Sequence, residues 1–334
     1  MKKRVLACLL CLALVFALSA VCFADNVTVL KYAHMNTEDN TSGQYAQWFA
    51  DRVEELTGGS IHVDVYPNSQ LGSIQEMAEM VSAGTVQLHH NTWGGLSAVY
   101  EKLELLDTPY LYKTVDDAIK LNDITTSPIL QQYNQELIDA AGVRILCSIY
   151  GGARELTCIK PIYSPDDLKG VKIRAIPSPV YITAVEGMGA IPVAVDWADT
   201  PAALATGVAD GQENPPVSIY TANLQETQKY MMDTKHIIAV GPIVMNEKAY
   251  QALTADQQAA IDQAAYETWE KFTASNIASE NEYIQLLIDD GVTFITKDDG
   301  LKVDEFKESV DALVAVNYAK YANEYAEIKD FLGY

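Results

Sequence analysis

The segment LKGVKIRAIPSP, residues 168–179, changes from a strand pattern to a helix start over a short stretch of chain. Apolar and polar side chains alternate from Gly170 to Ile176, which predicts a strand. Ser178 followed by Pro179 is typical of an N-cap and a first helical position. Arg174 therefore falls at a strand's carboxyl end, beside a helix N-terminus whose N–H groups favour an anion. Its planar guanidinium can hold a carboxylate through two hydrogen bonds.

The first part of the chain alternates strands with helices in the same way. Strands are predicted at residues 27–33, 61–65 and 86–90, with amphipathic helices at 43–56 and 73–83 between them. This order predicts an α/β fold with a parallel sheet covered by helices. Ligands of such sheets gather at the carboxyl ends of the strands. Those ends are residues 34–36, 66–67 and 91–93.

The rest of the chain predicts a second lobe and a helical C-terminal third. Strands are expected at 144–150 and 155–159 as a hairpin, and at 191–195, with turn and loop at 208–216. Thr254 to Gln257 is a capping box that opens one long helix, or two in line, reaching Asp289. A helix of ~35 residues is ~50 Å long, enough to span two lobes. A tyrosine-rich terminal helix is predicted at 310–331.

The N-terminus reads as an export signal. Basic residues precede an apolar run that ends in small residues, so residues 1–24 are interpreted as a signal peptide, with lipidation at Cys22 as an alternative. Its removal takes three of 23 basic and none of 45 acidic residues, leaving 20 and 45, a net charge of −25. Such a charge argues against nucleic acid and anionic lipid as partners. The mature chain is expected in the periplasm.

Few residues suggest metal or covalent chemistry. After signal removal only Cys147 and Cys158 remain, and the predicted hairpin leaves open a disulfide between them or two buried thiols. The five histidines lack the spacing of a helical zinc motif. The sequence contains no G-x-S-x-G elbow, P-loop or dinucleotide fingerprint. We therefore expect neither a metal nor a cofactor, and a protein that is not an enzyme.

Five segments, in this order and spacing, carry a family resemblance: PNSQLG (67–72), GGAR (151–154), DLKGVKIR (167–174), GAIP (189–192) and ALATGVADGQENP (203–215). The chain resembles a periplasmic solute-binding protein of the tripartite ATP-independent periplasmic (TRAP) transporters, of the DctP family. The resemblance implies a two-lobed Venus-flytrap fold with crossing strands and a long helix spanning both lobes. It places residues 25–150 and about 238–278 in lobe I, and residues 151–237 and about 279–334 in lobe II.

The resemblance also implies roles for individual residues. Arg174 falls on the arginine that salt-bridges the ligand's carboxylate, Asn214 on an asparagine that assists it, and Arg154 on a second arginine. Trp197 falls where an aromatic side chain packs on the ligand, and Asn36 and the turn Asn91-Thr92-Trp93 fall on the cleft wall. Alternatives remain open: Arg154 in an ion pair with an acidic neighbour, Asn214 as a turn cap, and Trp93 or Trp197 in the core.

These implications together predict a monomeric binding protein that captures a small organic acid by lobe closure. It would deliver the acid to the membrane subunits of a TRAP transporter. The alternatives are a binding protein that reports to a membrane receptor and a secreted enzyme acting on a carboxylic acid. The ligand stays open among sugar acids, keto or hydroxy acids, dicarboxylates and aromatic acids.

Overall fold

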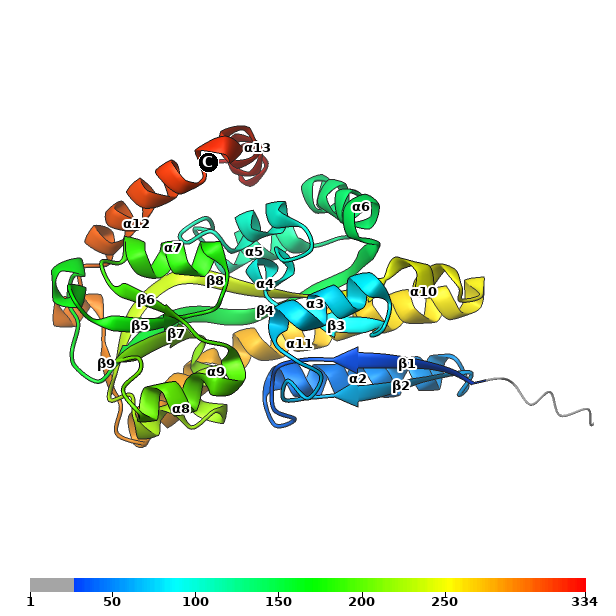
Figure 1. Ribbon diagram of the computed structural model, residues 1–334, viewed down its shortest axis with the longest axis horizontal. Coiled ribbons are helices and arrows are strands. Elements are labelled where there is room, and N and C mark those ends of the chain that lie inside the picture. The colour runs from blue at the N-terminus through cyan, green and yellow to red at the C-terminus, as the bar shows by residue number, and fades with distance from the viewer. Residues whose placement is uncertain (1–26) are drawn as a thin grey trace, which may run out of the picture.

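The computed structural model describes residues 27–334, so the predicted signal peptide lies outside the described residues (Figure 1). One mixed sheet runs through the molecule, with strand order β2-β1-β3-β8-β4-β7-β5-β6 and β9 paired to β8. The strands are β1 (Thr28–Ala33), β2 (Ile61–Tyr66), β3 (Leu88–His90), β4 (Val143–Cys158), β5 (Lys172–Ala175), β6 (Ile191–Ala194), β7 (Gly211–Asn214), β8 (Tyr230–Asn246) and β9 (Thr293–Ile295).

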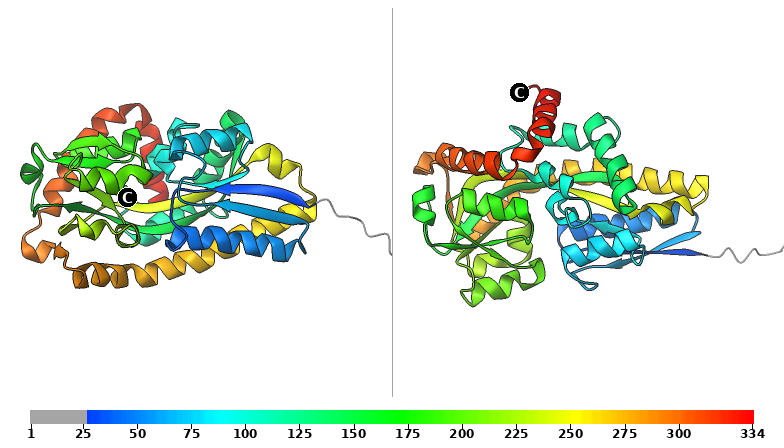
Figure 2. Two further views of the ribbon diagram at one scale, coloured as in Figure 1. Left: turned by 60° about the horizontal axis from the view of Figure 1, so that its bottom comes forward. Right: turned by 45° about the horizontal axis from the view of Figure 1, so that its top comes forward.

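Helices cover this sheet in two groups, which Figure 2 separates clearly. The first-lobe segment, residues 27–142, contains α2 (Thr41–Leu56), α3 (Ile74–Ala83), α4 (Trp93–Leu96), the 3₁₀ helix η1 (Glu101–Asp107), α5 (Val115–Asn122) and α6 (Pro128–Ala141). The second-lobe segment, residues 159–229, contains η2 (Pro165–Leu168), α7 (Pro179–Gly187), η3 (Trp197–Asp199), α8 (Thr200–Ala205), α9 (Pro216–Thr221) and η4 (Leu224–Glu226).

The first β-α-β-α-β unit forms as its sequence predicts. β1 pairs in parallel with β2 and with β3, and α2 and α3 connect the three strands. Asn40 caps α2, while Ser73 and Glu76 form a capping box on α3. The carboxyl ends of β1 and β3 therefore meet at one edge, as parallel strands require.

Strands β4 and β8 are the structural link between the two groups of helices. They pair antiparallel from Val143 opposite Asn246 to Cys158 opposite Tyr230, with three register shifts along the way. The predicted hairpin within residues 144–159 is therefore wrong. The Gly151-Gly152 pair stays inside a single strand at one of the shifts, where Gly152 adopts φ 113°. A glycine at positive φ marks a β-bulge here rather than a turn.

Because β4 is one continuous strand, its two cysteines lie far apart. Cys147 and Cys158 lie near opposite ends of the segment of β4 that was expected to fold back, and both are buried and free. Eleven strand residues span ~36 Å, which no disulfide can bridge. The loop predicted at residues 208–216 is also partly wrong, since Gly211–Asn214 forms the buried strand β7 between β4 and β5.

The C-terminal third begins, after α10 (Glu247–Gln251), with the single long helix α11 (Ala255–Asp289), opened by the predicted capping box at Thr254. It packs against α2, β4 and α9 and so contacts both segments. The predicted terminal helix is instead two helices, α12 (Val303–Asn317) and α13 (Ala322–Leu332), after the 3₁₀ helix η5 (Lys297–Asp299). A 3₁₀ turn, η6 (Ala319–Tyr321), separates them and redirects α13, which lets Ile328 and Leu332 bury in the main core. Within residues 27–334, no helix is long and apolar enough to cross a membrane.

Candidate functional site

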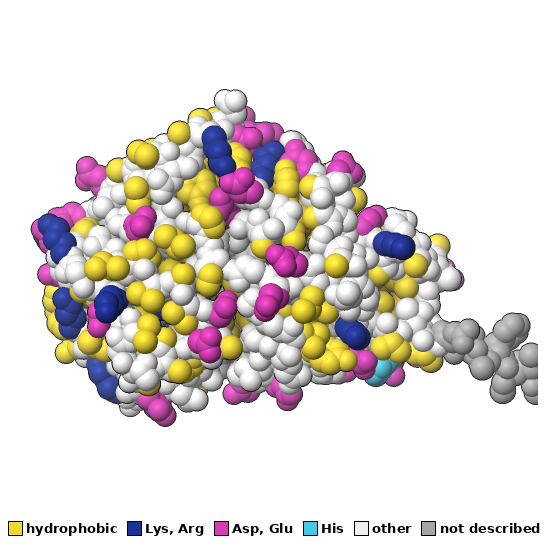
Figure 3. Space-filling view, viewed as in Figure 1, with side chains coloured by type: hydrophobic (Ala, Val, Ile, Leu, Met, Phe, Trp, Pro, Cys, Tyr) yellow, Lys and Arg dark blue, Asp and Glu magenta, His cyan; other side chains and the backbone are white. Residues whose placement is uncertain are grey.

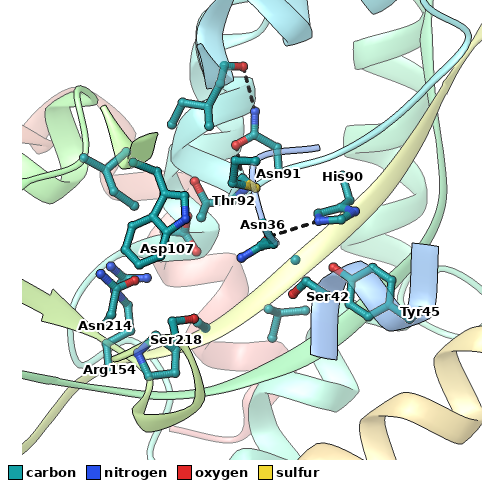
Figure 4. A pocket seen from close by; sticks show the side chains of 18 of the residues that line it. Asn36, Ser42, Tyr45, His90, Asn91, Thr92, Asp107, Arg154, Asn214 and Ser218 are labelled. Atoms are coloured by element: carbon teal, nitrogen blue, oxygen red, sulfur yellow. Dashed lines mark hydrogen bonds between the residues drawn. The ribbon is translucent and has the colours of Figure 1, made fainter. Parts of the chain in front are cut away.

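A pocket lies where the carboxyl ends of β1 and β3 face β7, α9 and the middle of β8 (Figure 4). The space between its walls is about 720 Å³, including the part open to solvent. The residues that line it are Met35, Asn36, Ser42, Tyr45, Ile74, His90, Asn91, Thr92, Asp107, Arg154, Arg174, Ile176, Trp197, Asn214, Pro215, Ser218, Ala239, Val240 and Gly241.

Arg174 is a buried, charged residue of this pocket with unused hydrogen-bond donors. Its side chain is 1% exposed, and its Nε donates to the Val195 carbonyl at 2.8 Å. Its Nη1 and Nη2 are buried and find no hydrogen-bond partner among the described residues. Burial lowers the pKa of Arg174 to about 10, with Arg154 contributing in the same direction and Glu213 opposing. The guanidinium is still charged at neutral pH, so two donors on a buried cation face the pocket without an acceptor.

Arg154 also lines the pocket, but its charge is already paired. Its Nε donates to Glu213 Oε2, and its Nη2 donates to Glu213 Oε1 at 2.8 Å and to the Glu213 carbonyl at 2.7 Å. His236 Nε2 lies 3.1 Å from the same Oε2. Burial would raise the pKa of Glu213, yet Arg154 and His236 outweigh it and lower that pKa to about 2. The arrangement is a buried, nearly neutral ion pair, of which Arg154 lines the pocket.

Asn214 and Trp197 complete the second-lobe wall. Asn214, the last residue of β7, donates from Nδ2 to Gln212 Oε1 at 2.5 Å. The Trp197 ring is half-buried, and its centroid lies 5.8 Å from the Arg174 guanidinium carbon. That separation places a flat apolar face beside the free cation.

Asn36, Asn91 and Thr92 reach the pocket from the first-lobe segment. His90 Nε2 is hydrogen-bonded to Asn36 Oδ1 at 3.2 Å, and His90 Nδ1 is hydrogen-bonded to the Tyr32 hydroxyl at 3.1 Å. Asn91 donates from Nδ2 to the Ile74 carbonyl and accepts at Oδ1 from the N–H of Thr92. Thr92 caps α4 by accepting from the N–H of Gly95. Of the two asparagines, Asn36 is therefore the one whose Nδ2 stays available for a ligand.

Trp93 does not reach the pocket. It is 0% exposed, belongs to the main core and is absent from the lining residues. As the first residue of α4, Trp93 points into the core, while its neighbour Thr92 faces the pocket. The sequence places both residues in one turn but does not say which side chain turns inward.

Asp107 is a pocket residue that the sequence did not reveal. Its Oδ2 accepts from the Gly94 N–H at 2.8 Å and from the Tyr181 hydroxyl at 2.9 Å. Its Oδ1 is buried and has no partner within residues 27–334. Burial raises the pKa of Asp107 to about 6, against the two hydrogen bonds. The one sequence signal is an acidic residue that ends the apolar run Leu105-Leu106 before Thr108-Pro109.

Three hydrogen bonds join the two segments around the pocket. Asn40 Nδ2 donates to Thr221 Oγ1 at 2.9 Å, Gln75 Nε2 to the Pro177 carbonyl at 2.5 Å, and Tyr181 to Asp107. Ser42 and Ser218, on the same helices as the first of these bonds, line the pocket. The first-lobe and second-lobe segments are thus hydrogen-bonded to each other around the pocket.

The chain has 45 acidic and 23 basic residues. Acidic side chains are scattered over the face shown in Figure 3, and the basic side chains on it lie away from its centre. Among the described residues, no group of three or more His, Cys, Asp or Glu side chains could hold a metal ion.

The comparisons with known proteins agree with this architecture. The family model of bacterial extracellular solute-binding proteins, family 7 (DctP), matches residues 32–321. The chain therefore belongs to this family, the solute-binding proteins of TRAP transporters. A solute-binding protein of Roseobacter denitrificans is 30% identical over 305 residues, which are 89% of each chain. The C4-dicarboxylate-binding periplasmic protein DctP of Rhodobacter capsulatus is 29% identical over 88% of this chain and 87% of its own.

Solved structures show the same two-lobed fold. A TRAP periplasmic solute-binding protein from Roseobacter denitrificans, crystallised with L-galactonate, superposes with a TM-score of 0.84 at 29% identity, covering 91% of this chain and 99% of its own. One from Actinobacillus succinogenes, also with L-galactonate, gives a TM-score of 0.85 at 26% identity, covering 92% and 99%. These relatives are binding proteins that accompany transport.

Proposed function

We propose that this chain captures a hydroxylated monocarboxylate of the sugar-acid class and delivers it to TRAP membrane subunits. The observation that carries the proposal is the buried Arg174, whose Nη1 and Nη2 face the pocket without acceptors. An unpaired buried cation is costly, and a carboxylate that accepts from both nitrogens removes that cost. Arg174 is accordingly the carboxylate anchor.

A single carboxylate fits the charges of the pocket better than two. Glu213 cancels the charge of Arg154, so Arg174 is the uncompensated cation on the wall. Asp107 adds an acidic group to the lining of the same pocket, and it would repel a second carboxylate when ionised. This favours a monocarboxylate over the C4-dicarboxylates of the Rhodobacter capsulatus relative.

The remaining polar groups suit hydroxyls. Asn36, Asn214, Ser42 and Ser218 supply neutral donors and acceptors, and Asp107 Oδ1 is a free acceptor. Trp197 supplies an apolar face for a carbon chain or ring. Two relatives with similar folds were crystallised with L-galactonate, a molecule with one carboxylate and many hydroxyls.

Capture would follow from closure of the two segments on the ligand. Closure is favoured only by the ligand's greater affinity for the closed state, and hinge motions of this type are well known. In this proposal the export signal directs the chain to the periplasm, and the protein works there as a monomer and without turning over its ligand. The residue ranges expected for the two lobes belong to the same proposal.

Calorimetry on the mature chain tests the proposal. We expect D-galactonate, L-galactonate or D-gluconate to bind, and succinate to bind far more weakly. Arg174→Ala should abolish measurable binding without loss of fold. Arg174→Lys should bind weakly, because an ammonium cannot make the two parallel hydrogen bonds. Native affinity in Arg174→Ala, or succinate binding tighter than every sugar acid, would contradict the proposal.

A further inference from the structure

A second pocket lies against β4 and shares no lining residue with the first. Its walls come from the end of α5, the loop before α6, the start of β4 and the middle of α11, and the space between them is about 760 Å³, including its open part. The lining residues used below are Asn122, Asp123, Arg144, Ser148, Asp262 and Tyr266, together with Trp269. Ser148 pairs across the sheet with Pro242, whose neighbour Gly241 lines the ligand pocket. Both pockets therefore take lining residues from β4, Arg154 in the first and Arg144 to Ser148 in the second.

Two buried polar side chains in this wall have unused hydrogen-bonding capacity. Ser148 is 3% exposed, and its Oγ has no partner within residues 27–334. Asn122 is 1% exposed; its Nδ2 donates to the Tyr112 hydroxyl at 2.9 Å and to the Ala118 carbonyl at 2.8 Å, but its Oδ1 is also unpartnered in the described part of the chain. Such buried groups are normally satisfied, because each one left alone costs about 1–3 kcal/mol.

The charged groups of the same pocket are, in contrast, already engaged. Arg144 donates from Nε to Glu247 Oε2 at 2.7 Å, and its guanidinium carbon lies 3.9 Å from the centroid of the Tyr250 ring. Asp262 accepts from the Tyr250 hydroxyl at 2.8 Å. Asp123 accepts from the N–H and the hydroxyl of Thr125, at 2.8 and 2.6 Å. With Arg144 paired to Glu247, these side chains offer no free cation to an anion, and Asp262 and Asp123 keep their negative charges, which disfavour an anionic occupant.

The outer wall is aromatic. Tyr266 is 47% exposed, and its ring centroid lies 5.5 Å from that of the half-buried Trp269. We infer that this pocket is a second ligand site, for a neutral polyhydroxylated ring such as a monosaccharide or cyclitol. Ring hydroxyls donate to Asn122 Oδ1 and pair with Ser148 Oγ, and the C–H face of the ring packs on the two aromatic side chains.

Saturation-transfer NMR titration of the mature chain with D-glucose, D-galactose and myo-inositol tests this inference. At least one of the three should bind saturably. Ser148→Ala should weaken that binding about fivefold, the equivalent of one hydrogen bond, and Tyr266→Ala should weaken it by a similar factor. Tyr283→Ala, on the same helix but outside the pocket, should leave it unchanged.

The ligand pocket needs its own control because neutral sugars resemble sugar acids. Arg174→Ala should bind the neutral probe like the native chain, which separates this site from the proposed carboxylate site. Saturable binding to none of the three probes would overturn the inference. So would native affinity for the probe in both Ser148→Ala and Tyr266→Ala, or binding that Arg174→Ala abolishes. None of these outcomes bears on the capture of sugar acids, which calorimetry measures separately.

Discussion

Asn40 donates from Nδ2 to Thr221 Oγ1 at 2.9 Å, and this bond ties the start of α2 to the end of α9 across the ligand pocket. Asn40 also caps α2 by accepting from the N–H of Ser42 at 2.8 Å. One side chain therefore fixes the entry of a first-lobe helix and holds the second-lobe segment. Because the bond joins the two segments, we expect it to break when they separate.

Loss of that bond should speed ligand release. Thr221→Val keeps the shape of the side chain but removes the acceptor, so the closed state loses about 1 kcal/mol, and the dissociation rate should rise about fivefold. Stopped-flow displacement of a bound sugar acid measures this rate. Gln47→Ala, on the same helix, removes only the exposed bond to Asp51 and should release the ligand at the native rate. An unchanged rate in Thr221→Val would mean that this bond does not hold the closed state.

The Arg154–Glu213 pair should matter for stability more than any surface pair. Glu213→Gln leaves Arg154 buried at 3% exposure without its counter-charge, which typically costs about 3–5 kcal/mol. Urea unfolding of the mature chain measures the change in free energy. Glu267→Gln, which breaks the partly exposed pair with Arg52, should cost under about 1 kcal/mol. Equal losses in the two variants would argue against a structural role for Glu213.

Affinity should depend on pH through Asp107. With its pKa raised to about 6 by burial, Asp107 is mostly protonated at pH 5 and ionised at pH 8. Ionisation adds a negative charge beside a bound carboxylate, so the dissociation constant should rise roughly threefold between these pH values. Calorimetry at several pH values checks this. Asp107→Asn keeps an oxygen that accepts from Gly94 and Tyr181, and its affinity should be flat with pH.

A pH profile that persists in Asp107→Asn would assign the titration to another group. A flat profile in the native chain would mean that Asp107 does not titrate near pH 6 in the folded protein.

Both cysteines should be inert thiols. Cys147 is 4% exposed and Cys158 is 0% exposed, and burial raises the pKa of each. Because the thiolate is the reactive form, a thiol reagent such as DTNB should label neither residue in the native mature chain and both in denaturant. Failure to label the unfolded, unreduced chain would reveal a disulfide, in conflict with a continuous β4.

The sequence predicted those elements whose structure is determined by nearby residues. Alternation and capping residues predicted the first β-α-β-α-β unit and α11, and the strand-to-helix junction predicted the position of Arg174 near the carboxyl end of a strand. Long-range packing decided the rest. The Gly151-Gly152 pair has the composition of a turn but lies in a bulge, because β8 pairs along the whole of β4. The residues GQEN of β7 lack apolar alternation, yet β4 and β5 bury them from both sides.

The same reason explains what the sequence left open or missed at the site. The partner of Arg154 is Glu213, which is distant in sequence but lies on the neighbouring strand β7. The sequence therefore allowed an ion pair for Arg154 as one alternative but could not select it. Trp93 is buried because α4 packs against η1 and α7. Asp107 was missed because its two donors, Gly94 and Tyr181, come from different elements.

The long crossing strands have a consequence for how this chain acquires its structure. Val143 pairs with Asn246 and Cys158 with Tyr230, so both ends of the β4–β8 ladder close over the same intervening stretch of polypeptide. Neither half of the molecule contains a complete sheet. A fragment of the chain that ends between β4 and β8 lacks β8, so one edge of β4 is left unpaired. The whole chain should therefore unfold in one cooperative transition. It should also fold slowly, because pairing distant segments has to come first.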